Sequence, residues 1–379
     1  MLDEILRKIV QEISITSAML DKAVDSYETV GKWIGEGIQY NVLIHPQGSM
    51  NLGTTNKPIS DEDDYDIDLV CMLKDGSSLS AEQIKNIVGD RLKENEIYRK
   101  KIEEEGEGKR CWKMQYYEFH MDVLPCVPNG IYIEPYSTDI RLTHKNDQYL
   151  YEDRYSNPVG YRRWFEQRMT NILQEEKRAF AAKNQLEIND VPTYRVKTPL
   201  QMVIQLLKRH RDICFQMDPD NAPISIIITT LAAHAYSGEP SVYEAMCNIL
   251  EHMEDYIIIK DGDTWVENPV MDEENFADKW KIYPQRKTAF ISWIQRAKRE
   301  LIKEPLKALG IDQIKQQYSC AFGEAPVTRA IKAYGHDMEN KRNGGKLYSA
   351  GLLGGLTGTA VTGAKEVKGH TFFGEEIIH

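Results

Sequence analysis

The chain of 379 residues has a formal net charge of −11 at pH 7, with 41% hydrophobic and 28% charged residues, which is ordinary for a soluble globular protein of about two domains. The acidic balance argues against a broad face for long DNA or RNA, because binding a polyanion requires a basic surface. No apolar run approaches the roughly 18 residues of a membrane span, and six scattered cysteines without a C-x-x-C pair favour reduced thiols in the cytoplasm over a structural zinc site.

The first predicted elements are helices within residues 1–37, where apolar residues recur at helical spacing. The opening stretch MLDEILRKIVQEI is amphipathic and lacks the pattern of a signal peptide. Val42 to Ile44 is then predicted as a short strand that leads into a turn at Gly48 and Ser49. Such a turn offers backbone N–H groups and a hydroxyl, which both suit a phosphate oxygen.

A buried strand is predicted next, because the run from Ile67 to Leu73 is apolar and contains no breaker. Asp66 and Asp68 lie at its start and share one face, since side chains on a strand alternate. Two ionised carboxylates this close need a compensating cation, and Mg²⁺ accepts such oxygens while keeping positions open for phosphates. A solvated acidic loop and the metal-binding D-x-D of a glycosyltransferase are alternatives.

A third carboxylate lies farther along the chain. Ser80 is predicted to cap a helix that runs to about Glu105, with Gln83 completing a capping box. Residues 111–128 are predicted to form a second strand with Asp122 on its polar face. If the two strands are neighbours, their ~4.8 Å spacing brings Asp122 to the same metal position. Three such carboxylates suit two-metal chemistry, whereas an edge strand with a polar face is the alternative.

The stretches QGSMNLGT, DYDIDLV and HMDVLPCVP together resemble the nucleotidyltransferase superfamily that contains poly(A) polymerase and oligoadenylate synthase. More narrowly, the chain is similar to the bacterial CD-NTases, relatives of cyclic GMP-AMP synthase that make cyclic oligonucleotide signals in anti-phage defence (CBASS). Further similar stretches extend the resemblance over most of residues 40–285. The resemblance implies an α/β (α+β) fold, in which a polymerase β-like mixed sheet precedes an α-helical domain and the active site lies between them.

The resemblance also assigns roles to residues. Asp66, Asp68 and Asp122 would be the catalytic carboxylates and the ligands of two Mg²⁺ ions, for which Mn²⁺ can substitute. The phosphate-binding turn would be lined by Gln47, Gly48 and Ser49. The bound substrates would be nucleoside triphosphates such as ATP or GTP.

A cationic cluster lies near the end of the helix that Thr198 is predicted to cap. From the residues alone, Lys208, Arg209 and Arg211 are most simply a solvated basic face. The resemblance implies instead that Lys208 contacts the donor triphosphate, with help from Ser225 on the following helix. Arg209 and Arg211 are then expected to be surface or ion-pair residues. His45 and His120, which flank the site, are expected to be hydrogen-bonded packing residues.

The implied reaction is the joining of nucleoside triphosphates into a cyclic di- or trinucleotide second messenger, with release of pyrophosphate. A downstream effector would bind the product. Two alternatives stay open. One is a nucleotidyltransferase that modifies another acceptor, such as a tRNA end, a protein or a small molecule. The other is a non-catalytic sensor that uses the fold to bind a nucleotide.

The predicted domain division is a nucleotidyltransferase core with an N-terminal helix at 1–190, a helical domain at 191–340 and a Gly-rich tail at 341–379. Residues 286–307 are predicted to form a bundle helix, with a calmodulin-like or membrane-surface helix as the alternative. The tail holds nine of the 25 glycines and is expected to be partly disordered or a turn-and-helix segment. In some CD-NTases an ancillary ubiquitin-transfer-like enzyme conjugates the C-terminus, which is a hypothesis for this tail.

Overall fold

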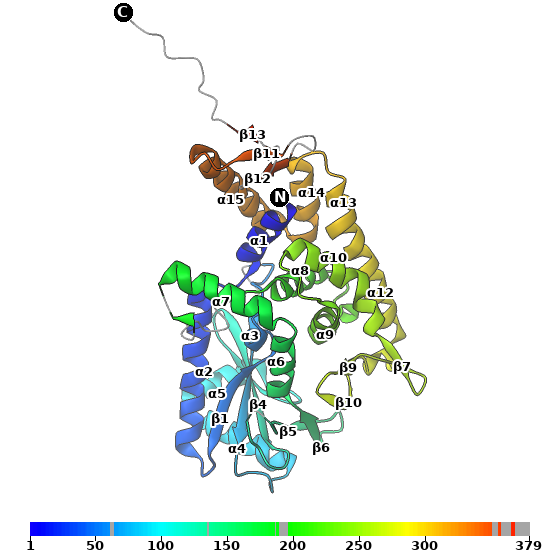
Figure 1. Cartoon of the computed structure of the whole chain (residues 1–379). Helices are drawn as coiled ribbons and strands as arrows, with labels where there is room; N and C mark the ends of the chain where they lie inside the picture. The colour runs from blue at the N-terminus through cyan, green and yellow to red at the C-terminus, as the bar shows by residue number, and fades with distance from the viewer. Residues whose placement is uncertain are drawn as a thin grey trace, which may run out of the picture.

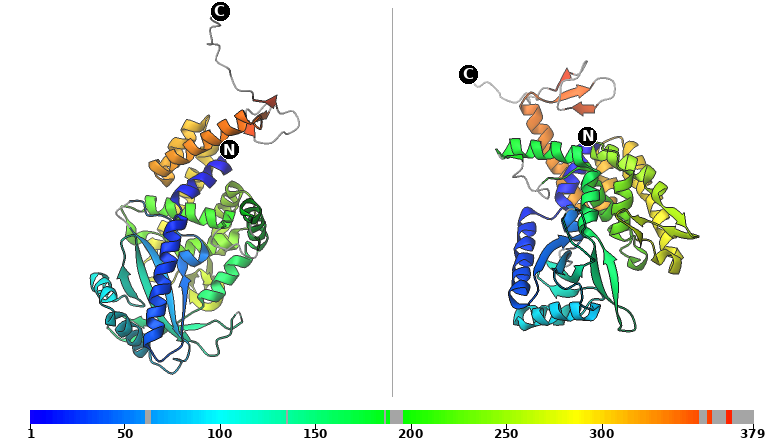
Figure 2. Two further views of the ribbon diagram at one scale, coloured as in Figure 1. Left: turned by 90° about the vertical axis from the view of Figure 1, so that its left-hand side faces the viewer. Right: turned by 60° about the horizontal axis from the view of Figure 1, so that its bottom comes forward.

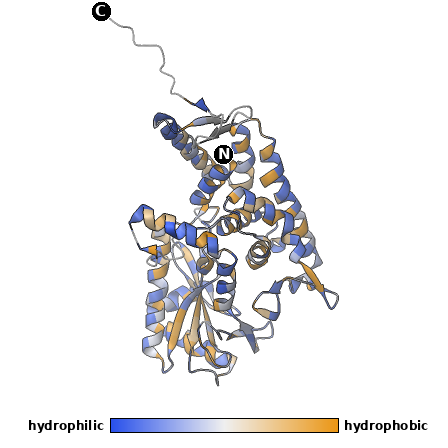
Figure 3. Cartoon of the chain, in the orientation of Figure 1, coloured by the Kyte–Doolittle hydropathy of each residue, from blue (hydrophilic) through white to orange (hydrophobic). Residues whose placement is uncertain are grey.

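A computed structural model describes residues 1–60, 64–134, 136–185, 187–188, 196–350, 355–357 and 365–367. A mixed sheet occupies the lower part of the molecule in Figure 1, and a helical assembly lies above it and to its right. Apolar residues concentrate on the strands and on the inward faces of the helices (Figure 3). This is the α/β arrangement that the sequence predicts.

The main sheet has the strand order β1-β2-β4-β5-β6, and β3 pairs with β4 beside this path. The central pair, β2 and β4, is parallel, while the other pairs are antiparallel. The strands are β1 (Val42–Gln47), β2 (Tyr65–Leu73), β3 (Trp112–Gln115), β4 (Phe119–Pro128), β5 (Ile140–Lys145) and β6 (Tyr151–Ser156).

Three helices bury one face of the sheet: α2 (Ser17–Gly37), α4 (Ala81–Glu94) and α5 (Glu96–Glu105). Figure 2 shows α2 crossing this face. The capping box of Ser80 and Gln83 is confirmed. The single helix predicted to reach Glu105 is wrong, because the chain breaks at Asn95, whose side chain accepts hydrogen bonds from the backbone of Ile97 and Tyr98 and so starts α5.

Shorter elements lie on the other side of the sheet and lead into the helical assembly. The helix α3 (Gly48–Leu52) follows β1 directly, and α6 (Pro158–Gln167) packs against it. Asn157 caps α6 by accepting from the backbone N–H of Gly160. The next helix is α7 (Thr170–Asn184).

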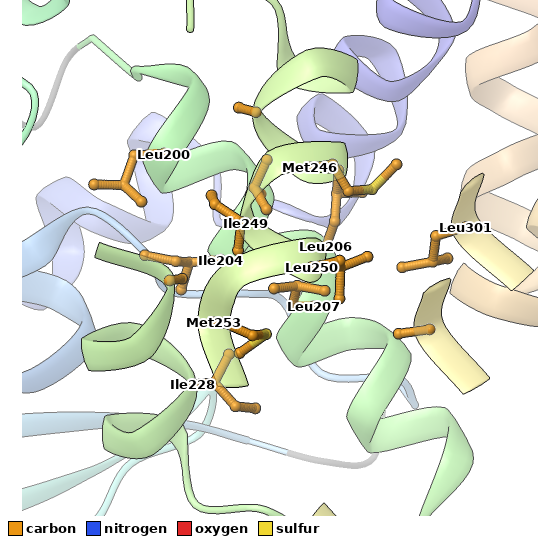
Figure 4. Packing of buried hydrophobic residues seen from close by; sticks show 14 of the residues in the cluster. Leu200, Ile204, Leu206, Leu207, Ile228, Met246, Ile249, Leu250, Met253 and Leu301 are labelled. Atoms are coloured by element: carbon orange, nitrogen blue, oxygen red, sulfur yellow. The ribbon is translucent and has the colours of Figure 1, made fainter. Parts of the chain in front are cut away.

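The helical assembly has one large apolar core, part of which is shown in Figure 4. Its helices are α1 (Leu2–Ile13), α8 (Pro199–Cys214), α9 (Ser225–Ala235), α10 (Val242–His252), α11 (Lys279–Ile282), α12 (Pro284–Ala297), α13 (Glu304–Leu306), α14 (Ile311–Phe322) and α15 (Glu324–Asn343). A π-helical segment, η5 (Lys298–Lys303), continues α12. The predicted bundle helix is confirmed, because Phe290, Trp293 and Ile294 of α12 are buried in this core.

Small elements complete the described chain. They are the 3₁₀ turns η3 (Pro219–Asn221) and η4 (Met253–Tyr256), and the short strands β7 (Ile258–Lys260), β8 (Asp263–Trp265), β9 (Glu267–Asn268), β10 (Met271–Asn275), β11 (Tyr348–Ala350), β12 (Gly355–Thr357) and β13 (Lys365–Glu366). Helix α15 extends into the Gly-rich tail as far as Asn343, and strands β11–β13 then form a small sheet. The proposed conjugation site at the end of the tail lies outside the described residues.

The first helix joins the helical core and not the sheet. Its apolar residues, which include Ile5 and Ile9, belong to the same cluster as α8 and α10, and α1 packs along α15. The first helix thus belongs with the helical assembly, and the domain boundary near residue 190 stays a prediction. Among the described residues, no helix combines the length and the apolar character that crossing a bilayer requires.

Candidate active site

The three carboxylates meet on neighbouring strands. In the register of β2 and β4, Asp68 lies directly opposite Asp122, and Asp66 lies opposite His120. Because these residues are two apart on each strand, all three carboxylates leave the sheet on the same face. The prediction that the two strands are neighbours is confirmed. The edge-strand alternative is wrong, because β4 pairs with β2 on one side and with β3 and β5 on the other.

The carboxylate face has more negative charge than the surrounding protein neutralises. Burial, together with the charges of Asp122 and Asp66, raises the pKa of the Asp68 carboxyl to about 6, against the opposing effect of Lys208. The pKa of Asp66 is also raised, first by burial and then by Asp122. A set of oxygen ligands that repel each other fits a hard divalent cation, which would return these groups to the ionised form.

The chain passes from β1 directly into α3 against this face, so Gly48 and Ser49 of the predicted phosphate turn are the first residues of α3. Gln47 at the end of β1 is opposite Asp68, and Gly48 follows with φ +63°. A Cβ atom on Gly48 would lie 2.2 Å from Asp68 Oδ2, so a side chain at this position is excluded by contact as well as by conformation. The next residue, Ser49, has its hydroxyl 3.0 Å from that of Thr55. The structure thus brings the predicted phosphate turn to the carboxylates.

Helix α8 supplies a buried cation. Lys208 is 8% exposed, and burial, followed by the charge of Arg211, lowers its pKa to about 8, while Asp66 and Asp68 oppose the shift. Its ammonium donates to the carbonyl of Thr54. The solvated-face interpretation is therefore wrong for this residue.

The two arginines of α8 differ from each other. Arg209 is 4% exposed and donates to the carbonyls of Lys57 and Pro58, so its assignment as a surface or ion-pair residue is wrong. Arg211 forms an ion pair with Asp212, as expected. It also donates to the hydroxyl of Ser225 at 3.2 Å. Ser225, the first residue of α9, is thus connected to the site through α8.

Two residues that the sequence argument missed lie next to Asp122. Lys113 is its partner across the β3–β4 pair, and Cys111 donates its thiol hydrogen to Asp122 Oδ2 at 3.2 Å. The alternation of Trp112, Lys113 and Met114 was a usable signal, because it places the lysine on the polar face. No pattern in the sequence indicates the cysteine.

The flanking histidines have different surroundings. His120 Nε2 lies 3.2 Å from Asp64 Oδ2, a contact that becomes an ion pair when the ring is protonated, so its role as a hydrogen-bonded packing residue stays a prediction. His45 on β1 was expected to be hydrogen-bonded as well, and this is wrong within the described part of the chain, where neither buried ring nitrogen has a partner. Burial lowers the pKa of His45 to about 4, so the ring is neutral.

A second group of possible metal ligands lies in the helical assembly. His210, Cys214 and Glu300 have ligand atoms within 4.8 Å of one another. Trp293 Nε1 can only donate, and its 3.0 Å contact makes His210 Nδ1 the acceptor, so the ring proton is on Nε2 and points at Glu300. Arg296 also donates to Glu300. With these groups already paired, the donor set does not fit a metal ion; we call it the His210 cluster, with Trp293 included.

Comparison with known proteins agrees with this geometry. Residues 42–125 match the family described as "Cyclic GMP-AMP synthase DncV-like, nucleotidyltransferase domain". The chain is 32% identical to a c-di-GMP synthase of Roseivirga ehrenbergii, over 99% of this chain and 97% of that protein. It is 24% identical to the cyclic dinucleotide synthase CdnG of Bradyrhizobium diazoefficiens, over 99% and 95% of the two chains.

Solved structures share the fold. The CD-NTase CdnG of Bradyrhizobium diazoefficiens, in complex with GTP, superposes with a TM-score of 0.68 at 20% identity, covering 88% of this chain and 98% of that one. The cyclic AMP-GMP synthase DncV of Vibrio cholerae, in complex with nonhydrolyzable GTP, gives 0.55 at 15% identity, covering 87% and 89%.

Proposed function

This chain belongs to the CD-NTase family of nucleotidyltransferases, and on that premise we propose that it joins two nucleoside triphosphates into a cyclic dinucleotide and releases pyrophosphate. The observation that carries the proposal is the convergence of three carboxylates, a phosphate turn and a buried lysine on one face of the sheet. A bound metal would neutralise the carboxylates, and a ligand with several negative charges would neutralise the lysine and the metal.

The roles of the residues follow from their positions. Gly48 and Ser49 would hold the triphosphate of the donor nucleotide at the turn, and the Lys208 ammonium would neutralise part of its charge. The thiol of Cys111 already donates a hydrogen bond to Asp122 Oδ2. The other carboxylate oxygen of Asp122 is therefore the one that would face the site. Ser225 would act with Arg211 at the edge of the triphosphate site.

Asp66, Asp68 and Asp122 would hold two Mg²⁺ ions, or Mn²⁺, through their carboxylate oxygens. The bound ions would lower the pKa of the attacking ribose hydroxyl and stabilise the leaving pyrophosphate. The raised pKa of Asp68 supports this assignment, because a carboxylate that resists ionisation alone gains most from a cation.

GTP is the substrate we propose first, and cyclic di-GMP is the corresponding product. The support is the name of the 32% identical relative, a c-di-GMP synthase, and the GTP in the structure of CdnG. A role in anti-phage defence, through an effector that binds the product, is the biological proposal that the family suggests. An ancillary enzyme that conjugates the tail remains a hypothesis.

The direct test incubates the protein with all four nucleoside triphosphates and Mg²⁺ or Mn²⁺, treats the products with phosphatase and identifies them by mass spectrometry. A phosphatase-resistant cyclic dinucleotide is expected. The product should disappear in the double variant Asp66→Asn, Asp68→Asn. Consumption of triphosphates only after a tRNA, a protein or a small molecule is added would contradict the proposal and favour another acceptor.

A further inference from the structure

The segment that follows the phosphate turn, residues 52–58, is held by side chains of helix α8. Four of them donate hydrogen bonds to its backbone carbonyls and form what we call the α8 clamp: Gln201 to Leu52 at 2.9 Å, Gln205 to Thr55 at 2.7 Å, Lys208 to Thr54 at 3.1 Å and Arg209 to Lys57 at 2.6 Å. The first three donors follow the spacing i, i+4, i+7 and therefore lie on one face of the helix. Helix α8 of the helical assembly thus fixes the backbone next to the phosphate turn.

The amide of Gln205 has one possible orientation. Lys197 donates to Gln205 Oε1 at 2.7 Å and to the hydroxyl of Ser14 at 2.6 Å. An ammonium has donors only, so the oxygen of the amide must face Lys197 and its nitrogen must face the Thr55 carbonyl. Gln205 is fully buried, and leaving its amide unpaired there would be strongly unfavourable. The lysine therefore orients the glutamine.

Thr55 extends this chain of contacts into the site. It is 6% exposed, and its hydroxyl lies 3.0 Å from the hydroxyl of Ser49. The backbone N–H of Thr54 also donates to the Ser49 carbonyl at 2.8 Å. Both the backbone and the side chain of Ser49 are thus set by the clamped segment.

We infer that Gln205 and Thr55 are positioning residues for the phosphate turn, and that the relay Lys197–Gln205–Thr55–Ser49 holds the serine hydroxyl in the orientation that accepts a triphosphate. The inference rests on the proposed function, because it takes Ser49 to be a phosphate contact. Neither residue touches the phosphate. Their effect is to remove the entropy loss that a freely rotating Ser49 hydroxyl would otherwise suffer on binding.

The test changes Thr55 to Val, which keeps the shape and removes the hydroxyl, and to Ser, which keeps the hydroxyl. Binding of the α,β-methylene analogue of GTP with Mg²⁺ is measured by calorimetry, and initial rates of pyrophosphate release give KM and kcat. We expect Thr55→Val to raise Kd and KM about tenfold with kcat nearly unchanged, because a hydrogen bond to a charged group is weakened in ground and transition states alike. Thr55→Ser should behave as the wild type.

A second variant tests the other end of the relay. Gln205→Glu keeps the contact with Lys197 and cannot donate to the Thr55 carbonyl, so the same rise in Kd is expected. Thr143→Val is the matched control for Thr55→Val. Thr143 on β5 is fully buried and its hydroxyl has no partner among the described residues, so the same substitution there should leave Kd unchanged. Thermal unfolding verifies that each variant is folded.

The outcomes separate the inference from the proposed function. Wild-type affinity for the analogue in a folded Thr55→Val variant would overturn the inference. A wild-type protein that forms no cyclic product, yet loses affinity in Thr55→Val and regains it in Thr55→Ser, would support the inference and count against the synthase proposal.

Discussion

Helix α8 connects two groups of ionisable side chains that are organised in opposite ways. At the sheet, Asp66, Asp68 and Asp122 collect like charges, and the pKa of Asp68 rises to about 6. In the His210 cluster each polar group faces a complementary one, and although burial opposes the shift, hydrogen bonds from His210 and two arginines lower the pKa of Glu300 to about 2. The first arrangement leaves like charges side by side, whereas the second pairs each polar group within the described residues. We conclude that the pairing of polar groups within a cluster is more informative than its composition. Unpaired like charges indicate a candidate site, and fully paired groups indicate a structural contact.

The largest expected effect is at the carboxylates. Replacing Asp68 with Asn should reduce product formation on the order of a thousandfold or more, because the cation loses a charged ligand. The same change should stabilise the metal-free protein at pH 7 by about 1–2 kcal/mol, since it removes a buried charge that the fold disfavours. Product is measured by mass spectrometry and stability by urea unfolding in EDTA.

The pH dependence follows from the raised pKa of Asp68. The ionised carboxylate destabilises the fold fully above about pH 6, and the penalty vanishes below the ordinary value of 3.8, where the group is protonated in both states. Wild type and variant should therefore converge in stability below pH 4. A variant that is less stable than the wild type at pH 7 would contradict the assignment.

The next effect is expected at Gly48. A Cβ here meets Asp68 Oδ2, so Gly48→Ala should displace the turn and lower kcat/KM about a hundredfold. Gly106→Ala is the matched control, because Gly106 also has a positive φ, +82°, but nothing lies within 4 Å of a Cβ there. It should lower the melting temperature and leave kcat/KM intact. Equal losses of activity in the two variants would argue against the contact as the cause.

A smaller effect is expected at Lys208. Lys208→Met should raise KM about tenfold, because a charge-assisted contact to the triphosphate is lost. In the wild type, affinity for the analogue should fall as the pH rises through about 8, where the free lysine loses its proton. That dependence should be absent from the Lys208→Met variant. Calorimetry between pH 7 and 9 measures both, and a KM that the substitution does not change would remove Lys208 from the site.

The smallest effect on activity is expected at the His210 cluster. Glu300→Gln should lower the free energy of unfolding by about 2 kcal/mol at pH 7 and leave kcat unchanged. The lowered pKa of Glu300 means that its stabilisation is present above its ordinary value of 4.5 and is lost as the pH falls towards 2. Differential scanning calorimetry from pH 3 to pH 7 reports this loss. A change in kcat without a change in melting temperature would show that the cluster acts on catalysis.

The same comparison explains how much the sequence could predict. The strand of Asp68 was predictable, because a breaker-free apolar run determines it, whereas the predicted turn at Gly48 is the start of the short helix α3. The neighbouring positions of Asp68 and Asp122 needed the assumption that two strands pair. The residues left that pairing as a condition, and the structure confirms it.

The errors arose where distant segments meet. Arg209 was expected on the surface, since nothing near it in sequence indicates that it donates to the Lys57 carbonyl. The break at Asn95 was missed, because a side-chain cap inside a helical pattern changes its periodicity little. Gln205 and Thr55 carry no motif. Their role follows only from the contact between α8 and residues 52–58.

The packing of α1 against α15 has a consequence for biosynthesis. The apolar face of α1 is buried partly by a helix that begins at Glu324, and the ion pairs of Glu12 with Arg329 and of Glu4 with Lys341 join the same two helices. At a translation rate of about 5–20 residues per second, α1 waits roughly 15–65 s on the ribosome before this partner exists. During that interval the nascent chain exposes an amphipathic helix, which makes it a natural client for chaperones. The part of the helical core that α1 and α15 share therefore forms only after α15 has been synthesised.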